Sequence, residues 1–208
     1  MSSPLVSVII PSFERFDYLM NAIESVLQQD YENFEIIVVN DASTQKQYYE
    51  VALPKQVKKI DLKVGLKQKY GFPTDAIRNE GVKKSEGKYL AFLDDDDIFI
   101  HKRVVELLNW ACGSYKIIGW KFLRPDKLIY KENMESPLEL GEIDTAGLCF
   151  DFSLKDQSSW NDQQFGDYHY YKSLLDKCYP HEKYFFNYVL TCTQFDNKIG
   201  NFGESEYI

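Results

Sequence analysis

The N-terminal part of the chain alternates between continuously apolar segments and a segment with helical periodicity. Residues 5–11 (LVSVIIP) and 34–41 (FEIIVVND) are rich in β-branched residues and largely apolar, which is typical of buried strands. Residues 17–29 (DYLMNAIESVLQQ) lie between them, and their apolar side chains fall on one face of a helix: Leu19, Ile23, Val26 and Leu27. This stretch therefore predicts a β-α-β unit.

The same alternation continues along the first half. A short helical segment is expected at 44–51, a weaker strand at 57–64, a helix at 74–84 (TDAIRNEGVKK) and another apolar strand at 88–93 (KYLAFL). Strands that are apolar on both faces and alternate with helices are typical of a mostly parallel sheet with helices on both faces. The predicted fold class is therefore α/β.

The second half of the chain is less regular and rich in aromatic residues. Strands are expected at 115–123 (YKIIGWKFL) and 127–130 (KLIY), a pair of strands within 144–154, and a helix at 166–178 (GDYHYYKSLLDKC). Aromatic side chains pack in cores and also stack on ligands. We expect most of these rings to belong to the core and one or two to contact a ligand.

Four consecutive aspartates, Asp94 to Asp97, follow an expected buried strand. Like charges a few ångströms apart repel by roughly 1 kcal/mol per pair in water and about 4 kcal/mol at an effective dielectric of 20. Two carboxylates in D-x-D spacing can face one magnesium or manganese ion, which relieves that repulsion. A solvated turn is the alternative, but Leu93 before the run and Ile98 and Phe99 after it are core-type residues, which favours an ordered site.

Two other expected strands end in polar or special residues. In open α/β sheets, ligands bind outside the carboxyl ends of the strands. We therefore expect these residues to converge with the acidic run on one site. They are Pro11, Ser12, Phe13 and Glu14 after the first strand, and Asn40 and Asp41 after the second.

Composition limits the classes of function. The 208 residues are 44% hydrophobic and 27% charged, which fits one globular domain over 1–208. The formal net charge of −8 disfavours a nucleic-acid partner, because such binding needs a basic surface. The apolar segments are too short for a transmembrane helix, and the N-terminus lacks a signal-peptide pattern. A cytoplasmic protein with a small-molecule partner and no transmembrane segment is expected.

Several common ligand-binding motifs are absent from the sequence. The acidic run lacks the glycine and distal glutamate of an EF-hand, and the chain has neither a GxxxxGK[ST] loop nor a strand-linked GxGxxG. The cysteines show no CxxC pairing, so we expect buried free thiols rather than disulfides or zinc ligands. They are Cys112, Cys149, Cys178 and Cys192.

Residues 6–44 (VSVIIPSFERFDYLMNAIESVLQQDYENFEIIVVNDAST) and 76–98 (AIRNEGVKKSEGKYLAFLDDDDI) resemble the nucleotide-sugar-binding half of family 2 glycosyltransferases with the GT-A fold. The motifs stand in the family's order over roughly the first 110 residues, and the resemblance is weaker beyond. It implies a single GT-A domain with a nucleotide-sugar-binding half at 1–110 and an acceptor-binding half at 111–208.

The resemblance implies roles for individual residues. In the family, the acid after the second strand accepts a hydrogen bond from a ring N–H of the base, which uracil, thymine and guanine offer. The arginine of the A-I-R-N segment reaches the nucleotide, the first acids of the D-x-D-D run touch the ribose, and the third, here Asp96, binds the metal. The implied nucleotide-binding residues are Pro11, Ser12, Phe13, Glu14, Asp41, Arg78, Asp94 and Asp95. Two alternatives stay open: Asp41 as the cap of a helix, and Arg78 in a structural salt bridge.

The resemblance also implies a catalytic base in the second half. Inverting members of the family have an aspartate at the start of a helix, usually after a glutamate. The closest match is FGDYHYYKSLL, which implies Asp167 as the base and Asp162 as the backup, although Gly166 stands where glutamate is usual. Asp167 is also suited to cap its own helix. His169 and His181 are expected to be structural.

The resulting hypothesis is a metal-dependent inverting glycosyltransferase of glycan synthesis that uses Mn²⁺ or Mg²⁺. A carboxylate removes the proton of an acceptor hydroxyl, which attacks the sugar of a nucleotide-sugar donor, UDP-sugar first and dTDP or GDP next. One alternative is a nucleotidyltransferase, although PSFERF lacks the glycine and lysine of that class's loop. The other is a non-catalytic sugar-nucleotide-binding module. The released product discriminates among them: nucleoside diphosphate, pyrophosphate or none.

Overall fold

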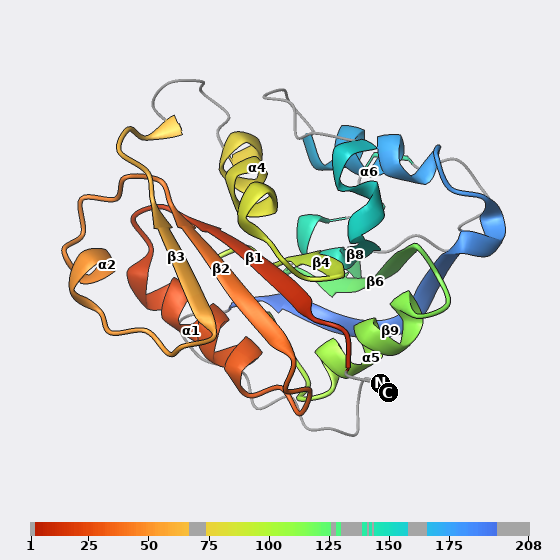
Figure 1. The fold of residues 1–208 in the computed structure, drawn as a ribbon, viewed down its shortest axis with the longest axis horizontal. Coiled ribbons are helices and arrows are strands. Elements are labelled where there is room, and N and C mark those ends of the chain that lie inside the picture. The colour runs from red at the N-terminus through yellow and green to blue at the C-terminus, as the bar shows by residue number, and fades with distance from the viewer. Residues whose placement is uncertain are drawn as a thin grey trace.

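One mixed β-sheet runs through the protein (Figure 1). The computed structural model describes residues 3–66, 74–125, 128–129, 139–140, 142, 144–157 and 166–194. Within them the sheet has nine strands in the order β3-β2-β1-β4-β8-β6-β9-β5, with β7 paired to β6. The strands are β1 (Val6–Ser12), β2 (Phe34–Asn40), β3 (Val57–Asp61), β4 (Tyr89–Phe92), β5 (Asp97–Phe99), β6 (Ile117–Leu123), β7 (Leu128–Ile129), β8 (Leu148–Asp151) and β9 (Lys183–Thr193).

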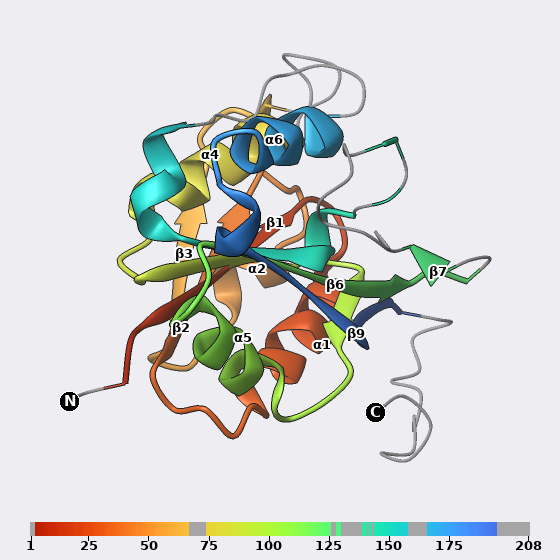
Figure 2. The ribbon, with the colours of Figure 1, turned by 90° about the vertical axis from the view of Figure 1, so that its right-hand side faces the viewer.

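Helices cover both faces of the sheet, as Figure 2 shows. The helices are α1 (Phe16–Leu27), α2 (Gln47–Glu50), α4 (Thr74–Lys84), α5 (Val104–Cys112) and α6 (Gly166–Leu175), with short 3-10 turns η1 (Thr145–Gly147), η2 (Phe152–Gln157) and η3 (Pro180–Glu182). Helices α1 and α5 pack on one face and α4 and α6 on the other. None of the described helices has the length and apolarity to cross a bilayer.

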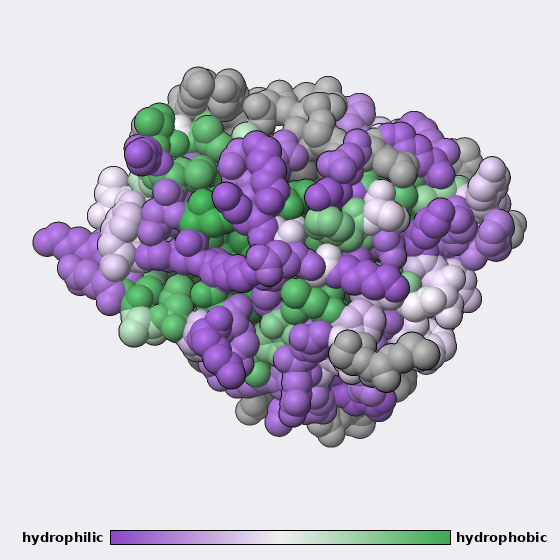
Figure 3. Space-filling model, in the orientation of Figure 1, coloured by the Kyte–Doolittle hydropathy of each residue, from purple (hydrophilic) through white to green (hydrophobic). Residues whose placement is uncertain are grey.

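Alternate residues of β1 belong to two apolar cores, one on each face of the sheet. Val8 and Ile10 belong to the core under α1 and α5, whereas Ile9 belongs to the core under α4 and α6. Helix α4 approaches β1 so closely that a Cβ atom on Gly81 would stand 2.4 Å from Ile9 Cγ2. Hydrophilic residues extend across the face drawn in Figure 3, and hydrophobic residues show there in smaller areas. Because an apolar core lies on each face of the sheet, the central strands are buried on both sides, as their apolar sequences predict.

The regular elements expected in the first half are confirmed. Strand β1 pairs in parallel with β2 on one side and with β4 on the other, and β2 pairs in parallel with β3. Because the chain places later strands on both sides of β1, the carboxyl ends of β1 and β4 flank a switch point of the kind where ligands bind. The α/β class is therefore confirmed, and the expected parallel arrangement is found in this half.

The second half differs from its predicted elements. Strand β8 pairs antiparallel with β4 and with β6, so the whole sheet is mixed. The strand pair expected at 144–154 is wrong: this segment holds the single strand β8 between η1 and η2. Helix α5 and the strands β5 and β9 were not among the predicted elements. The four cysteines are buried and free, as expected.

Candidate functional site

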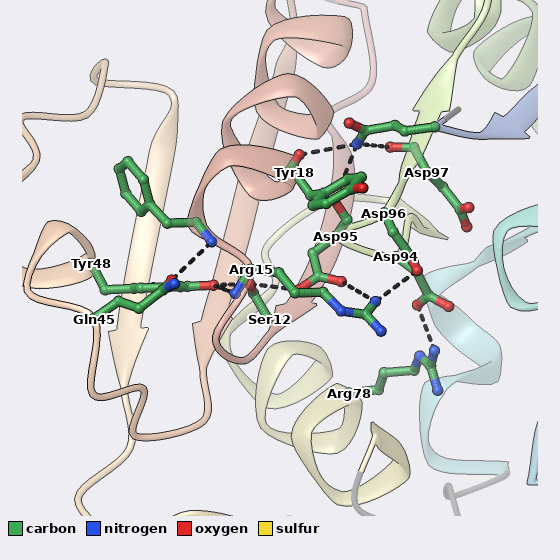
Figure 4. A network of polar contacts seen from close by, with 12 residues as sticks. Ser12, Arg15, Tyr18, Gln45, Tyr48, Arg78, Asp94, Asp95, Asp96 and Asp97 are labelled. Carbon is green, nitrogen blue, oxygen red and sulfur yellow. Dashed lines mark hydrogen bonds and ion pairs between the residues drawn. The ribbon is translucent and has the colours of Figure 1, made fainter. Parts of the chain in front are cut away.

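The four aspartates form a tight turn at the carboxyl end of β4 (Figure 4). The N–H of Leu93 donates to the carbonyl oxygen of Ile9 in β1 at 3.0 Å, which keeps the strand beside β1 up to the turn. The N–H of Asp97 then donates to the carbonyl oxygen of Asp94 at 3.0 Å and closes the turn. The prediction of an ordered acidic turn, held between core residues, is confirmed.

Asp95 and Asp96 point toward the loop that follows β1. Asp95 is buried, and its Oδ2 accepts a hydrogen bond from Ser12 Oγ at 2.8 Å. Arg15 Nη1 lies 3.2 Å from Asp95 Oδ1 and 2.6 Å from Asp96 Oδ2. Burial raises the pKa of Asp95 to about 6, although the contacts with Ser12 and Arg15 act in the opposite direction. One guanidinium group thus bridges the second and third acids of the run.

Asp94 and Asp97 belong to a separate acidic cluster. Oxygen atoms of Asp94, Asp97 and Asp144 lie within 4.8 Å of one another. Arg78, a buried residue of α4, donates from Nη2 to Asp94 Oδ1 at 2.5 Å, and Arg124 forms an ion pair with Asp144. Burial, followed by the charges of Asp94 and Asp144, raises the pKa of Asp97 well above its usual value. The cluster therefore holds three carboxyl groups against two arginines.

The donor set fits a divalent cation. Carboxylate oxygens are the ligands that magnesium and manganese prefer. In the described part of the chain, five carboxylates surround the turn, from Asp94 to Asp97 and Asp144, against three arginines. Asp96, the predicted ligand, is not a member of the compact cluster, because its carboxylate lies against Arg15. Its role as a ligand stays a prediction.

The second predicted acid, Asp41, lies beside the end of β1. Its N–H donates to the carbonyl oxygen of Ser12 at 3.0 Å, and its side chain is fully buried. Oδ1 accepts a hydrogen bond from the N–H of Leu66 at 2.6 Å. Asn40, rather than Asp41, accepts the N–H of Ser43 at 3.0 Å. The contact with Leu66 joins Asp41 to the segment that follows β3.

The loop after β1 is held by contacts with the loop after β2. Glu14 has a φ of 57°, a backbone conformation uncommon outside glycine, and its Oε1 accepts the N–H of Thr44 at 2.5 Å. The hydroxyl of Tyr48 lies 2.5 Å from Ser12 Oγ and accepts the N–H of Arg15 at 3.0 Å. Pro11 and Ser12 are buried, whereas Phe13 and Glu14 are half-buried. These four residues form the end of β1 and the loop after it, and their roles in binding remain predictions.

The predicted base, Asp167, lies in the second half of the chain, in helix α6. Asp167 belongs to the first turn of α6, the helix that shares a sheet face with α4. Its backbone position at a helix start is as expected. The backup residue, Asp162, lies outside the described residues.

Sequence reasoning missed several residues that hold the site. Arg15 follows the Pro11–Glu14 loop directly, so its place in the sequence could have suggested it. Tyr48, Arg124, Asp144 and Gln194 come from distant segments and carry no local motif. Only the folded chain brings them to the acidic turn.

Comparisons with known proteins agree on one family. The family model described as glycosyl transferase family 2 matches residues 7–135. An uncharacterized glycosyltransferase of Rickettsia bellii is 46% identical over 99 residues, which cover 48% of this chain and 14% of that protein. The Escherichia coli protein named UDP-Glc:alpha-D-GlcNAc-diphosphoundecaprenol beta-1,3-glucosyltransferase WfgD is 31% identical over 149 residues, covering 65% of this chain and 57% of that protein. The chain spans only part of these relatives.

Solved structures agree on the fold. S. aureus TarS 1-349 matches with a TM-score of 0.71 at 18% identity, covering 91% of this chain and 60% of that one. The same protein is known in complex with UDP-GlcNAc. The mannosyltransferase PcManGT from Pyrobaculum calidifontis, in complex with GDP-Man and Mn²⁺, matches with a TM-score of 0.64 at 12% identity, covering 92% of this chain and 57% of that one.

Proposed function

Because this chain belongs to glycosyl transferase family 2, we propose that it is a metal-dependent enzyme that moves a sugar from a UDP-sugar to an acceptor hydroxyl with inversion. The observation that carries the proposal is the position of Ser12. Its carbonyl oxygen accepts the N–H of Asp41 at 3.0 Å, and its hydroxyl donates to Asp95 at 2.8 Å. The proposed base-binding acid and the proposed metal-binding turn therefore meet at the end of β1, where nucleotides bind in open α/β sheets.

Asp41 is the residue proposed to bind the nucleotide base. A buried carboxylate can accept a ring N–H from uracil, thymine or guanine. The known complexes of TarS with UDP-GlcNAc and of PcManGT with GDP-Man are consistent with either a uracil or a guanine donor. The name of the Escherichia coli relative contains UDP-Glc, so we place a UDP-sugar first and GDP- and dTDP-sugars after it.

Asp96 is the proposed metal ligand. When bound, Mn²⁺ or Mg²⁺ would neutralise the charge of the departing diphosphate. Asp95 is proposed to face the ribose together with Asp94, and Arg78 to reach the nucleotide from α4. Arg78 forms a salt bridge with Asp94, which is the alternative role left open for it. The same side chain is the one proposed to contact the nucleotide.

Asp167 is the proposed general base in the acceptor-binding half. A carboxylate at the start of α6 would take the proton of the acceptor hydroxyl as that oxygen attacks the anomeric carbon. The name of the Escherichia coli relative describes an acceptor linked to diphosphoundecaprenol, which makes lipid-linked sugars a first choice for the acceptor in an assay.

The test is an incubation with a panel of nucleotide sugars, with Mn²⁺ and with a chelator, followed by product analysis. Release of a nucleoside diphosphate that depends on metal and acceptor is the expected result. Release of pyrophosphate from a sugar phosphate and a nucleoside triphosphate would instead identify a nucleotidyltransferase. Tight nucleotide-sugar binding without any product would favour the non-catalytic binding module.

A further inference from the structure

Arg15 forms an ion pair with Asp96, the proposed metal ligand. Its Nη1 lies 2.6 Å from Asp96 Oδ2, and Figure 4 shows the guanidinium group beside the acidic turn, on the side where Arg78 approaches. Among the described residues, no other cationic group contacts Asp96. A divalent ion that binds Asp96 must therefore compete with this contact.

The two contacts of Arg15 differ in strength. The Asp96 side chain is 36% exposed and that of Arg15 50% exposed, so solvent screens their attraction and the pair holds weakly. The Asp95 side chain is only 8% exposed, and its second oxygen is fixed by Ser12. Loss of the Asp96 contact would therefore leave the guanidinium anchored to Asp95.

Arg15 also has hydrogen-bonding capacity to spare. An arginine offers five N–H donors, and in the described part of the chain only Nη1 of this one makes contacts. Its backbone is fixed, since its N–H donates to the hydroxyl of Tyr48. Planar guanidinium groups suit the oxygen atoms of phosphates, to which they donate two parallel hydrogen bonds.

We propose that Arg15 is a donor-binding residue that exchanges partners: it pairs with Asp96 before ligands bind, and it contacts the diphosphate of the donor once a metal ion binds Asp96. This inference rests on the proposed function. Before the donor arrives, the pair neutralises Asp96 and lowers the affinity of the site for a metal ion alone. After it arrives, Arg15 adds a positive charge next to the diphosphate, so that metal and nucleotide bind better together than separately.

The first experiment measures Mn²⁺ binding alone, by electron paramagnetic resonance, for the wild type, R15Q and R103Q. Arg103 is a matched control, because it is an exposed arginine whose Nε lies 2.7 Å from a carboxylate oxygen of Glu106, within one helical turn. R15Q should bind Mn²⁺ about two- to fivefold more tightly, the value of one exposed ion pair. R103Q should match the wild type.

The second experiment measures UDP and uridine binding in the presence of Mn²⁺. R15Q should lose about 10- to 100-fold in UDP affinity, the value of a charge-assisted hydrogen bond, and should keep the wild-type affinity for uridine, which has no phosphate. Retained uridine binding also shows that the variant is folded. R103Q should bind both ligands like the wild type.

The outcomes separate this inference from the function on which it rests. If the wild type binds UDP with Mn²⁺ and R15Q binds it equally well, the exchange of partners is wrong while the proposed function stands. Equal loss of UDP and uridine affinity would also overturn the exchange, because it would make Arg15 a structural residue of the loop. If the wild type binds neither UDP nor another nucleoside diphosphate, both the function and the inference fall.

Discussion

The backbone N–H of Gln194 donates to the carbonyl oxygen of Asp96 at 2.7 Å, so a residue at the end of β9 holds the acidic turn. Its side-chain Nε2 donates to the carbonyl oxygens of Tyr18 at 3.0 Å and of Asp95 at 3.2 Å, and its Oε1 accepts from Asn21 Nδ2 at 2.9 Å. This buried amide fastens the turn to α1.

Replacing Gln194 by methionine should loosen the turn without changing the size of the side chain much. The variant loses three side-chain hydrogen bonds worth about 0.5–1.5 kcal/mol each, so the free energy of unfolding should fall by about 1.5–4.5 kcal/mol. Mn²⁺ affinity should fall as well, because the carboxylates are less well positioned. Denaturant unfolding and Mn²⁺ titration measure the two effects. Gln28→Met is the control, since Gln28 is exposed and its side chain contacts Glu24 one helical turn away; equal behaviour of the two variants would contradict the role of Gln194.

Replacing Asp96 by asparagine should remove a metal ligand while keeping the shape of the side chain. Loss of a ligand should lower Mn²⁺ affinity and sugar transfer by about 10²-fold or more, since even groups that only orient a ligand are worth about 10–100-fold. The thermal midpoint should change little, because Asp96 is partly exposed. The control is Asp176→Asn, an exposed aspartate paired with Lys172 at 3.1 Å. Wild-type transfer by the Asp96 variant would show that Asp96 is not a metal ligand.

Replacing Asp167 by asparagine should lower transfer by roughly 10² to 10⁴, the usual value of a general base. Nucleotide affinity should stay near that of the wild type, because the carboxylate acts on the acceptor and does not hold the donor. Transfer rates and UDP titration give the two readouts. If Asp162→Asn loses transfer instead, the backup residue is the base; full transfer in both variants would refute the proposed base catalysis.

A buried carboxylate far from the acidic turn should make stability depend on pH. Glu35 in β2 accepts hydrogen bonds from Ser7 Oγ at 2.6 Å and from the N–H of Glu86 at 2.7 Å, and it lies 2.8 Å from Lys58 Nζ. Burial alone would raise its pKa, but these contacts, that with Lys58 first, outweigh burial and lower it. The folded state therefore favours the charged form of Glu35.

The sign of the pH effect follows from that lowered pKa. A carboxyl whose pKa falls on folding stabilises the protein above its unfolded value, here 4.5, and this stabilisation is lost as the pH falls through the folded value. Glu35→Gln should therefore cost about 1–2 kcal/mol near pH 7 and clearly less near pH 3. Urea unfolding across this range measures it, with Glu106→Gln, an exposed ion-paired control, nearly flat. A cost that is the same at both pH values would contradict this account.

The sequence was most informative where local pattern and burial coincide. The strands β1, β2 and β4 are apolar on both faces because helices cover both sides of this part of the sheet, and their residues 8, 37 and 91 are fully buried. Such strands carry an unambiguous signal. The positions of Ser12, Asp41 and the acidic turn follow from it, because parallel strands bring their carboxyl ends to one edge.

The second half is less predictable because its elements depend on distant partners. Strand β9 pairs with β6 through two register shifts and with β5 in the opposite direction, and its burial does not alternate regularly. Strand β5 is only three residues long and exists through its pairing with β9. For the same reason no local pattern could reveal Asp144 or Gln194 as neighbours of the turn, since each acquires its place only through tertiary contacts.

The order of protein synthesis determines when this site can take shape. The aspartates and β1 to β4 emerge early, but Asp97 pairs with Thr193, and Gln194 holds the backbone of the turn. A nascent chain stopped before residue 183 contains every acid of the run and none of these contacts. At about 5–20 residues per second, the roughly 100 residues between the acidic run and Gln194 take on the order of 5–20 seconds to synthesise. Strands β1 to β4 can therefore assemble on the ribosome well before the acidic turn acquires its final geometry.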